Sequence, residues 1–290
     1  MTTSEHLGSV TRSTNLDRRS ASNPAQRRIV QSPSLALRLY AAMCAALLGS
    51  LAPGYANAED AAHITPYRPT ISNSAQLPTP GQVELELGLL ATRNDANRRS
   101  LPYLLKLAFN PDWGVLIGGE AYVSQRTDDG GSLSGIGNTV VTAKRAWIIN
   151  DARAWGLEFS ASLPSAKTEI GGGKTDLGVN GILSQDLGTL HLDTNLNLTR
   201  IGAIEADTGR IQTGLSAALT LPLVPRWSLA AELAATRRNG TDGTAQALTA
   251  LTYSPSKTLT IDAGVSKGLR AGARDWSFFT GLVVPIGTLW

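Results

Sequence analysis

The chain has 290 residues, of which 42% are hydrophobic and 17% charged, and its formal net charge is +3. This length is enough for one large domain or two small ones. Six of the 26 basic residues and two of the 23 acidic residues precede Glu59, which leaves 20 basic and 21 acidic residues after it. The main part of the chain is therefore close to neutral, and its charge gives no reason to expect a nucleic-acid partner.

Residues 1–58 are predicted to be a signal peptide that is cleaved after Ala58. Arginines precede the apolar run 39–52, and small residues precede the expected cleavage site. The run is too short for a confident membrane helix, so an uncleaved anchor is the weaker alternative. The polar stretch before Arg27 is long for a signal peptide. It is either disordered, or the true start codon lies further downstream. Cys44, the one cysteine, lies in the apolar run, so the exported chain is expected to lack disulfides.

Residues 82–290 show the period of two that is typical of β-strands. In 154–163, for example, Trp155, Leu157 and Phe159 alternate with small or polar residues. Short connections alternate with longer ones that are rich in glycine and charge, which predicts hairpins. We expect twelve strands, at 82–93, 100–109, 113–125, 136–149, 154–164, 175–185, 190–201, 210–221, 226–237, 244–253, 258–268 and 276–290.

The tryptophans distinguish a membrane barrel from a soluble sandwich, the alternative for many alternating strands. Five of them lie beside short turns or at the chain end, namely Trp113, Trp147, Trp155, Trp227 and Trp290. A sandwich core would place aromatic residues in mid-strand, whereas a ring at one end is an interfacial girdle. Because lipid leaves no backbone group unpaired, the first strand should pair with the last. The predicted fold is an all-β transmembrane antiparallel up-and-down barrel of about 12 strands, with both termini periplasmic.

Polar residues of these strands are expected to point into the lumen, because the outer face meets lipid. By parity the candidates are Glu84, Glu86, Lys106, Glu120, Lys144, Glu158, His191, Asp193, Glu232 and Asp262, with Asn180, Asn195, Asn197 and Gln246. They either hold the shape of the barrel through hydrogen bonds or line a narrow hydrated path that weakly favours cations. Lys144 with Glu158, and Lys106 with Glu120, are predicted to form pairs across adjacent strands.

The sequence gives little support to an enzyme. His191 is the one histidine inside a predicted strand, and no serine stands at a spacing that indicates a nucleophile–base pair. It is interpreted as a hydrogen-bonding residue of the lumen rather than a catalytic base. With two histidines and no cysteine after residue 58, no metal site is expected, and no cofactor is predicted. The glycine-rich stretch 171–175 lacks the frame of a phosphate-binding loop and is interpreted as an outer loop.

Most basic residues after Glu59 lie in or beside the long connections, among them Arg93, Arg98, Arg99, Arg126, Arg237, Arg238, Arg270 and Arg274. They are interleaved with acidic residues, so a solvated loop surface is one interpretation. The other is contact with the phosphates of lipopolysaccharide in the outer leaflet. The sequence leaves both open.

Several stretches resemble one family of outer-membrane proteins, described as "putative MetA-pathway of phenol degradation" and often called simply transporters. They are 68–88, 101–115, 135–147, 162–188 and the closing WSFFTGLVVP at 276–285. The resemblance implies a passive outer-membrane channel for a small solute of hydrophobic or aromatic character, and it transfers no catalytic or binding residue.

Two alternatives are a closed structural or surface-interaction barrel, its lumen plugged by Glu59–Pro80, and a lipid-modifying enzyme. We expect 59–81 to be a periplasmic or lumenal segment and 82–290 to be the barrel. Trp290 resembles the C-terminal aromatic residue that the barrel-assembly machinery recognises.

Overall fold

A computed structural model describes residues 63–93, 97–127, 129–270, 272–273 and 275–290. The predicted signal peptide, residues 1–58, lies outside the described residues. Within the described ranges, no helix is both long enough and apolar enough to cross a membrane.

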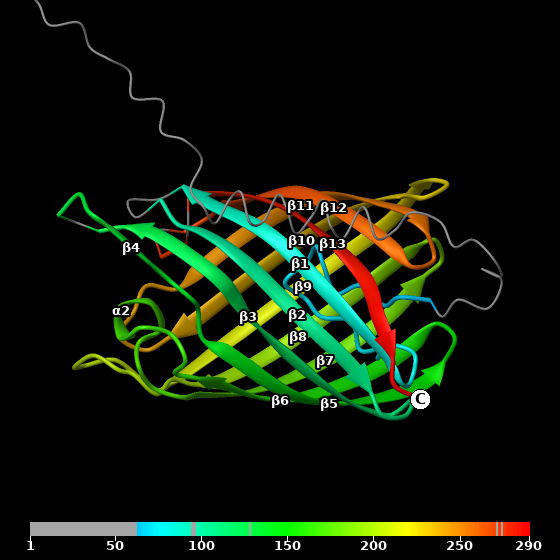
Figure 1. The fold of residues 1–290 in the computed structure, drawn as a ribbon, viewed down its shortest axis with the longest axis horizontal. Helices are drawn as coiled ribbons and strands as arrows, with labels where there is room; N and C mark the ends of the chain where they lie inside the picture. Colours follow the sequence, from blue (N-terminus) through cyan, green and yellow to red (C-terminus); the bar gives the residue numbers. More distant parts are fainter. Residues whose placement is uncertain (1–62, 94–96, 128, 271, 274) are drawn as a thin grey trace, which may run out of the picture. The chain divides into compact units, whose positions relative to one another are not determined.

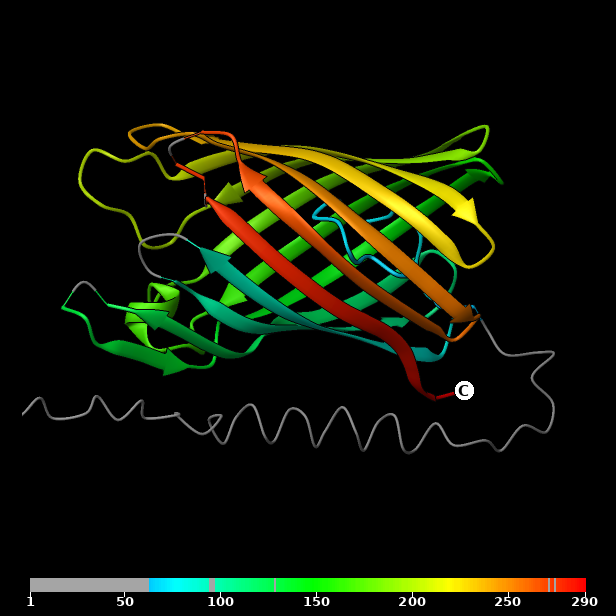
Figure 2. The ribbon, with the colours of Figure 1, turned by 90° about the horizontal axis from the view of Figure 1, so that it is seen from above.

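The described chain forms a closed antiparallel barrel of twelve strands (Figures 1 and 2). Each of these strands pairs with its neighbours in sequence order, and the first strand also pairs with the last. The strands are β1 (Gln82–Arg93), β2 (Arg99–Ala108), β3 (Trp113–Arg126), β5 (Thr139–Asn150), β6 (Arg153–Leu163), β7 (Asp176–Leu187), β8 (Leu190–Arg200), β9 (Ile211–Val224), β10 (Trp227–Arg238), β11 (Thr244–Ser256), β12 (Leu259–Gly268) and β13 (Trp276–Thr288). A further short strand, β4 (Ser132–Gly135), pairs only with the end of β3.

The alternation of side chains gives this barrel an apolar outside and a polar inside. On β10, Glu232 is 3% exposed whereas its neighbour Leu233 is 62% exposed. On β1, Glu84 and Glu86 are buried in the same way. A soluble sheet would show the reverse distribution, so the exposed apolar belt requires lipid around it.

The predicted pairing of the first strand with the last is confirmed. β1 and β13 are in register from Gln82 opposite Thr288 to Arg93 opposite Trp276, with one irregularity after Val83. In Figure 2 the two strands lie side by side along the length of the barrel. On β13, Phe278 is exposed on the outer face and Gly281 is buried on the inner one. Among the described residues, closure gives each of the twelve barrel strands a neighbour on both sides, as a lipid environment demands.

Some sequence-based boundaries were wrong. The expected loop 126–135 contains β4, because β3 continues beyond the barrel rim as a hairpin, with Val123 opposite Gly135. The strand expected from residue 136 therefore begins only at Thr139. The expected loop 165–174 contains a single helical turn, α2 (Thr168–Gly171). Strands β9 and β11 run into the expected short turns, as far as Val224 and Ser256.

Candidate functional site

Residues 63–81, here called the lumenal segment, lie inside the barrel (Figure 2). The segment begins at the short-turn end, where the Ile64 N–H donates to the Lys257 carbonyl at 3.1 Å. It ends at the same end, where the Gly81 N–H donates to the Ala108 carbonyl at 2.9 Å and the chain enters β1. Between these two points it crosses the lumen as a loop, so the lumen is occupied by the protein's own chain.

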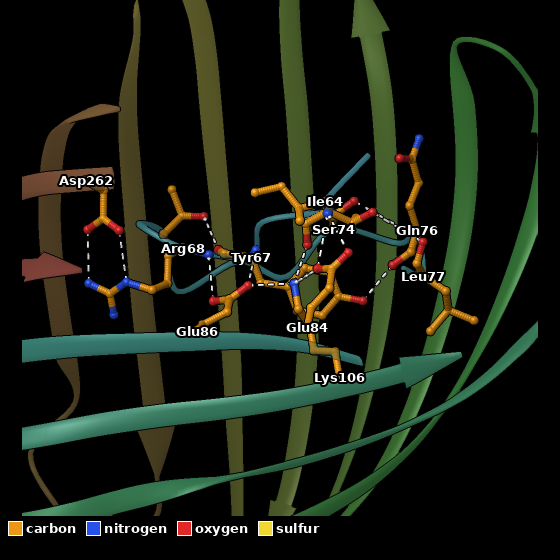
Figure 3. Close-up of polar contacts among 12 residues, drawn as sticks. Ile64, Tyr67, Arg68, Ser74, Gln76, Leu77, Glu84, Glu86, Lys106 and Asp262 are labelled. Carbon is orange, nitrogen blue, oxygen red and sulfur yellow. Dashed lines mark hydrogen bonds and ion pairs between the residues drawn. The ribbon is translucent and has the colours of Figure 1, made fainter. Parts of the chain in front are cut away.

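The first anchor of the segment is a buried ion cluster on β1 and β2 (Figure 3). The Lys106 Nζ lies 2.9 Å from Glu84 Oε2 and 2.7 Å from Glu86 Oε1, and it also donates to the Thr65 carbonyl. Glu84 accepts the Thr65 N–H at 3.0 Å, and Glu86 accepts the Tyr67 N–H at 2.8 Å. Three predicted lumen residues therefore bind backbone of the segment.

Tyr67 connects this cluster to a second buried lysine. Its ring centroid lies 4.3 Å from Lys106 Nζ and 4.2 Å from Lys144 Nζ, within the range of cation–π attraction. Its hydroxyl donates to the Gln76 carbonyl at 2.6 Å, which ties the two arms of the loop together. Burial raises the pKa of the Tyr67 hydroxyl well above its usual range, with a further contribution from nearby carboxylates, chiefly Glu158. The hydroxyl therefore stays neutral and keeps its proton for this bond.

Arg68 lies in a cradle formed by three adjacent strands. Its guanidinium makes a two-pronged pair with Asp262 on β12, with Nε to Oδ2 at 2.9 Å and Nη2 to Oδ1 at 3.0 Å (Figure 3). Gly88 and Gly281 face each other across β1 and β13. A Cβ at Gly88 would lie 2.5 Å from Arg68 Nη1, and one at Gly281 would lie 2.3 Å from Nε. Because glycine has no Cβ, these two positions leave room for the Arg68 guanidinium.

The far end of the loop is held by Glu232 on β10 and Asn195 on β8. Glu232 accepts the Ile71 N–H at 2.8 Å, and it accepts the Ser72 N–H and hydroxyl, both at 2.6 Å. Asn195 accepts the Asn73 N–H at 2.8 Å and donates to the Asn73 carbonyl at 2.9 Å. Both residues lie near the middle of their strands, so the loop crosses the lumen at about half its depth.

The returning arm is anchored on β5, β6 and β7. Lys144 lies 3.0 Å from Glu158, its register partner, so this predicted cross-strand pair is confirmed. Glu158 also accepts the Asn73 side-chain amide at 3.0 Å, and Lys144 donates to the Ser74 carbonyl. The Ala75 N–H donates to Ser184 Oγ at 2.8 Å. This lysine–glutamate pair therefore holds the segment as well as joining two strands.

The predicted pair of Lys106 with Glu120 is wrong. The register of β2 and β3 places Lys106 opposite Leu116 and Glu120 opposite Pro102. Lys106 stands directly opposite Glu84 on its other neighbour, β1, so the nearest carboxylates come from that strand. Glu120 instead pairs with Arg98, with Nη1 to Oε1 at 2.6 Å.

His191 lies at the short-turn end, between two carboxylates. Its Nδ1 lies 2.5 Å from Asp186 Oδ1 and its Nε2 lies 3.3 Å from Asp193 Oδ2. Ser184, the serine nearest this group in the hydrogen-bond network, donates to Asp193 and not to the imidazole. The arrangement is therefore not that of a serine nucleophile with a histidine base. Within the described ranges, no group of three His, Cys, Asp or Glu residues is placed to hold a metal ion.

The five tryptophans proposed for the girdle all have exposed side chains at the short-turn end. Trp147 is the register partner of Trp155, and Trp227 packs against Tyr253 with ring centroids 4.7 Å apart and ring planes tilted by 33°. Arg145 lies over Trp113 and Trp147, at 5.0 and 5.1 Å from their ring centroids. The exposed fractions run from 38% for Trp147 to 62% for Trp290. Amphipathic rings in these positions suit the membrane–water interface.

Comparison with known proteins places the chain in a family. The family model described as "Putative MetA-pathway of phenol degradation" matches residues 67–285. The chain belongs to this family. The match covers almost the whole barrel and starts inside the lumenal segment. No sequence among the curated proteins matches the chain significantly.

Solved structures share the fold of this chain at low sequence identity. An outer membrane channel from Pseudomonas putida F1 superposes with a TM-score of 0.60 and 13% identity, over 77% of this chain and 100% of that one. The KdgM porin has a TM-score of 0.50 and 10% identity, over 70% of this chain and 99% of that one. The NanC porin has a TM-score of 0.50 and 10% identity, over 70% and 98%. The chain is therefore an outer-membrane β-barrel of porin-like fold.

Strand periodicity did not identify the residues of the lumenal segment that bind the wall. Thr65, Tyr67, Arg68, Ser72 and Asn73 lie outside any repeating pattern. The sequence does carry one signal: most of the inward charges lie in the halves of their strands that are next to the short turns. Buried charges need partners, and a chain segment that precedes the barrel is one source of such partners.

Proposed function

We propose that this protein is an outer-membrane channel for the passive passage of a small solute. In this proposal the far end of the lumenal segment, residues 68–73, is a constriction that moves during passage. The observation that supports it most directly is how the constriction is held. Within the described residues, 68–73 are bound to the wall through its side chains, chiefly Glu86, Asp262, Glu232 and Asn195. No strand pairing joins them to the described part of the barrel, so their release leaves the wall hydrogen bonds intact.

Further parts of the proposal rest on the family and on the distribution of side chains. The family description mentions phenol degradation, which supports an aromatic or hydrophobic solute. We place the short turns, the tryptophan girdle and both chain ends on the periplasmic side. Exposed arginines at the long-loop end, such as Arg93 and Arg99, are proposed to contact the phosphates of lipopolysaccharide.

A closed structural barrel is the second candidate, and the number of contacts made by the segment favours it. The buried carboxylates Glu84, Glu86, Glu158 and Glu232 all accept hydrogen bonds from the segment. If these contacts never open, the lumen passes nothing. The geometry around His191 gives no support to the third alternative, a lipid-modifying enzyme.

A reversible disulfide separates the two candidates. Ser72 Oγ and Ser216 Oγ lie 2.8 Å apart, so cysteines at both positions are close enough to bridge. We expect the reduced Ser72→Cys/Ser216→Cys protein to let a small solute enter liposomes, and we expect this flux to cease when the disulfide is formed. Each single-cysteine variant, treated with the same oxidant, is the control. Equal flux in both redox states would show that residues 68–73 do not move, and no flux in either state, nor in the wild type, would favour the closed barrel.

A further inference from the structure

A recess of about 460 Å³ lies beside the lumenal segment. Its wall comes from five consecutive strands, β8 to β12, with His191, Asp193, Thr220, Ser228, Thr252 and Thr260 among the lining residues. The opposite side is the segment itself, including Thr65, Tyr67 and Arg68. The volume lies within the usual range of small-molecule pockets, about 300–1,000 Å³.

The recess is bounded on its deep side by the contacts that hold the far end of the loop. On three of the wall strands, a lining residue is followed a few positions deeper by a residue that binds the segment. Asp193 is followed by Asn195, Ser228 by Glu232, and Thr260 by Asp262. The recess therefore faces the short-turn end, and residues 68–73 separate it from the long-loop half of the lumen.

The charged groups of the lining already have partners. Arg68 is paired with Asp262, and His191 lies between Asp186 and Asp193. His63, near the open end, contacts the Ile64 carbonyl through its Nδ1 at 3.2 Å. A charged solute would lose its hydration on entering, and the lining groups of opposite charge are already paired with other residues. Burial of such a solute would therefore be energetically unfavourable.

The remaining wall is rich in hydroxyl groups. Thr220, Ser228 and Thr252 stand on three successive strands, and Ser254 shares a hydrogen bond with Thr260 at 2.9 Å. A hydroxyl group both donates and accepts, so such a wall matches a solute that does the same. We propose that the recess is a binding site for a small uncharged solute that carries hydroxyl groups. The role of the site in transport rests on the proposed channel function, but its lining favours a more hydrophilic solute than the aromatic or hydrophobic one that the family description supports.

Protection of an introduced cysteine from labelling tests the site directly. The chain has no cysteine other than Cys44, which lies in the predicted signal peptide, so Ser228→Cys gives a single reactive thiol in the recess. The full-length barrel in detergent is labelled with a small thiosulfonate in the presence of glucose, glucuronate or glucosamine, which keep the same ring and differ mainly in charge. We expect about 100 mM glucose to slow labelling about threefold, as for a dissociation constant of about 50 mM, and the charged analogues to have no effect.

Ala152→Cys is the matched control, because Ala152 is exposed in the turn between β5 and β6 and lies outside the recess. Its labelling should be the same with all three compounds. Thr252→Cys repeats the test on the next strand, should Ser228→Cys fail to fold. No protection by glucose, or equal protection by glucuronate or glucosamine, would overturn the proposed site.

Flux measurements on the wild-type protein keep this inference distinct from the proposed function. If glucose protects the recess while the wild type passes no solute into liposomes, the channel proposal fails and the binding site stands. If the wild type passes glucose without any protection at Ser228→Cys, the channel stands and the binding site is overturned.

Discussion

Glu232→Gln is the sharpest test of the constriction, because it keeps the size of the side chain and removes its charge. One carboxylate oxygen of Glu232 accepts both the N–H and the hydroxyl of Ser72, and the other accepts the Ile71 N–H. Glutamine keeps a single oxygen, so its amide nitrogen must face a donor of the loop. The side chain is 3% exposed, so water does not replace the lost acceptor.

The size of the effect follows from these three bonds. One charge-assisted hydrogen bond is lost and one buried donor is left unsatisfied, while the other two bonds weaken. Together these changes cost about 3 kcal/mol, which raises the fraction of molecules with a detached loop about 150-fold. Single-channel recording in planar bilayers measures this fraction as the open probability.

Asp275→Asn is the control for loss of a negative charge, because Asp275 is exposed at the long-loop end and pairs with Lys267 there. It should leave the open probability unchanged. If the Glu232→Gln barrel is folded, as judged by its heat-modifiable mobility in gels, and opens no more often than the wild type, then this carboxylate does not hold a moving gate.

Three further predictions concern other contacts of the same chain. Gly88→Ala places a Cβ 2.5 Å from Arg68 Nη1 and should displace the guanidinium from Asp262. We therefore expect the open probability to rise as much as in Arg68→Gln. If the effects of the two substitutions add in the Gly88→Ala/Arg68→Gln double mutant, they do not share this cause. Lys106→Met leaves the buried Glu84 and Glu86 without their cation and should lower the free energy of unfolding by about 3–5 kcal/mol, so an unchanged urea midpoint would show that the cluster adds little. Trp290→Ala should slow insertion into the outer membrane, as measured by pulse-chase, more than it lowers the melting temperature of the folded barrel. Normal assembly would count against recognition of this residue by the barrel-assembly machinery.

The wall of the barrel was predictable from sequence because its pattern repeats. Alternation assigns each side chain to one of two faces of its strand. Because lipid surrounds the barrel and the lumen is polar, the apolar face must point outward and the polar face inward. This reasoning correctly gave the closure of β1 on β13, and it also gave the contact of Lys144 with Glu158. The closure followed from the need to pair every backbone group in lipid, whereas the contact of Lys144 with Glu158 depends on local order along one hairpin with a short turn.

The partners of the inward residues were less predictable, because parity identifies a face and not a neighbour. Lys106 has a strand on each side, and only the true register shows that Glu84 stands opposite it. The register of β2 and β3 also shifts between Leu101 and Pro102, where proline offers no N–H to the ladder. No residue count along the strands would have shown this shift.

The conformation of the lumenal segment has no periodic signal at all. Its course is set by single contacts to many strands, such as Arg68 with Asp262 and Asn73 with Asn195. Such contacts depend on three-dimensional positions that exist only in the closed barrel. The sequence could therefore suggest that 59–80 plugs the lumen without showing which residues do so.

The partners of the lumenal segment also impose an order of events on biogenesis. Residues 65–68 bind Glu84 and Glu86, fewer than twenty positions away, whereas Arg68 finds Asp262 at a separation of 194. The Arg68 cradle further needs Gly88 and Gly281, which meet only when the first strand joins the last. A stretch that is synthesised before any strand is thus among the last to reach its final place. Until that moment Asp262 and Glu232 lack the Arg68 and Ser72 groups that bind them, so the docking of the segment depends on the closure of the wall.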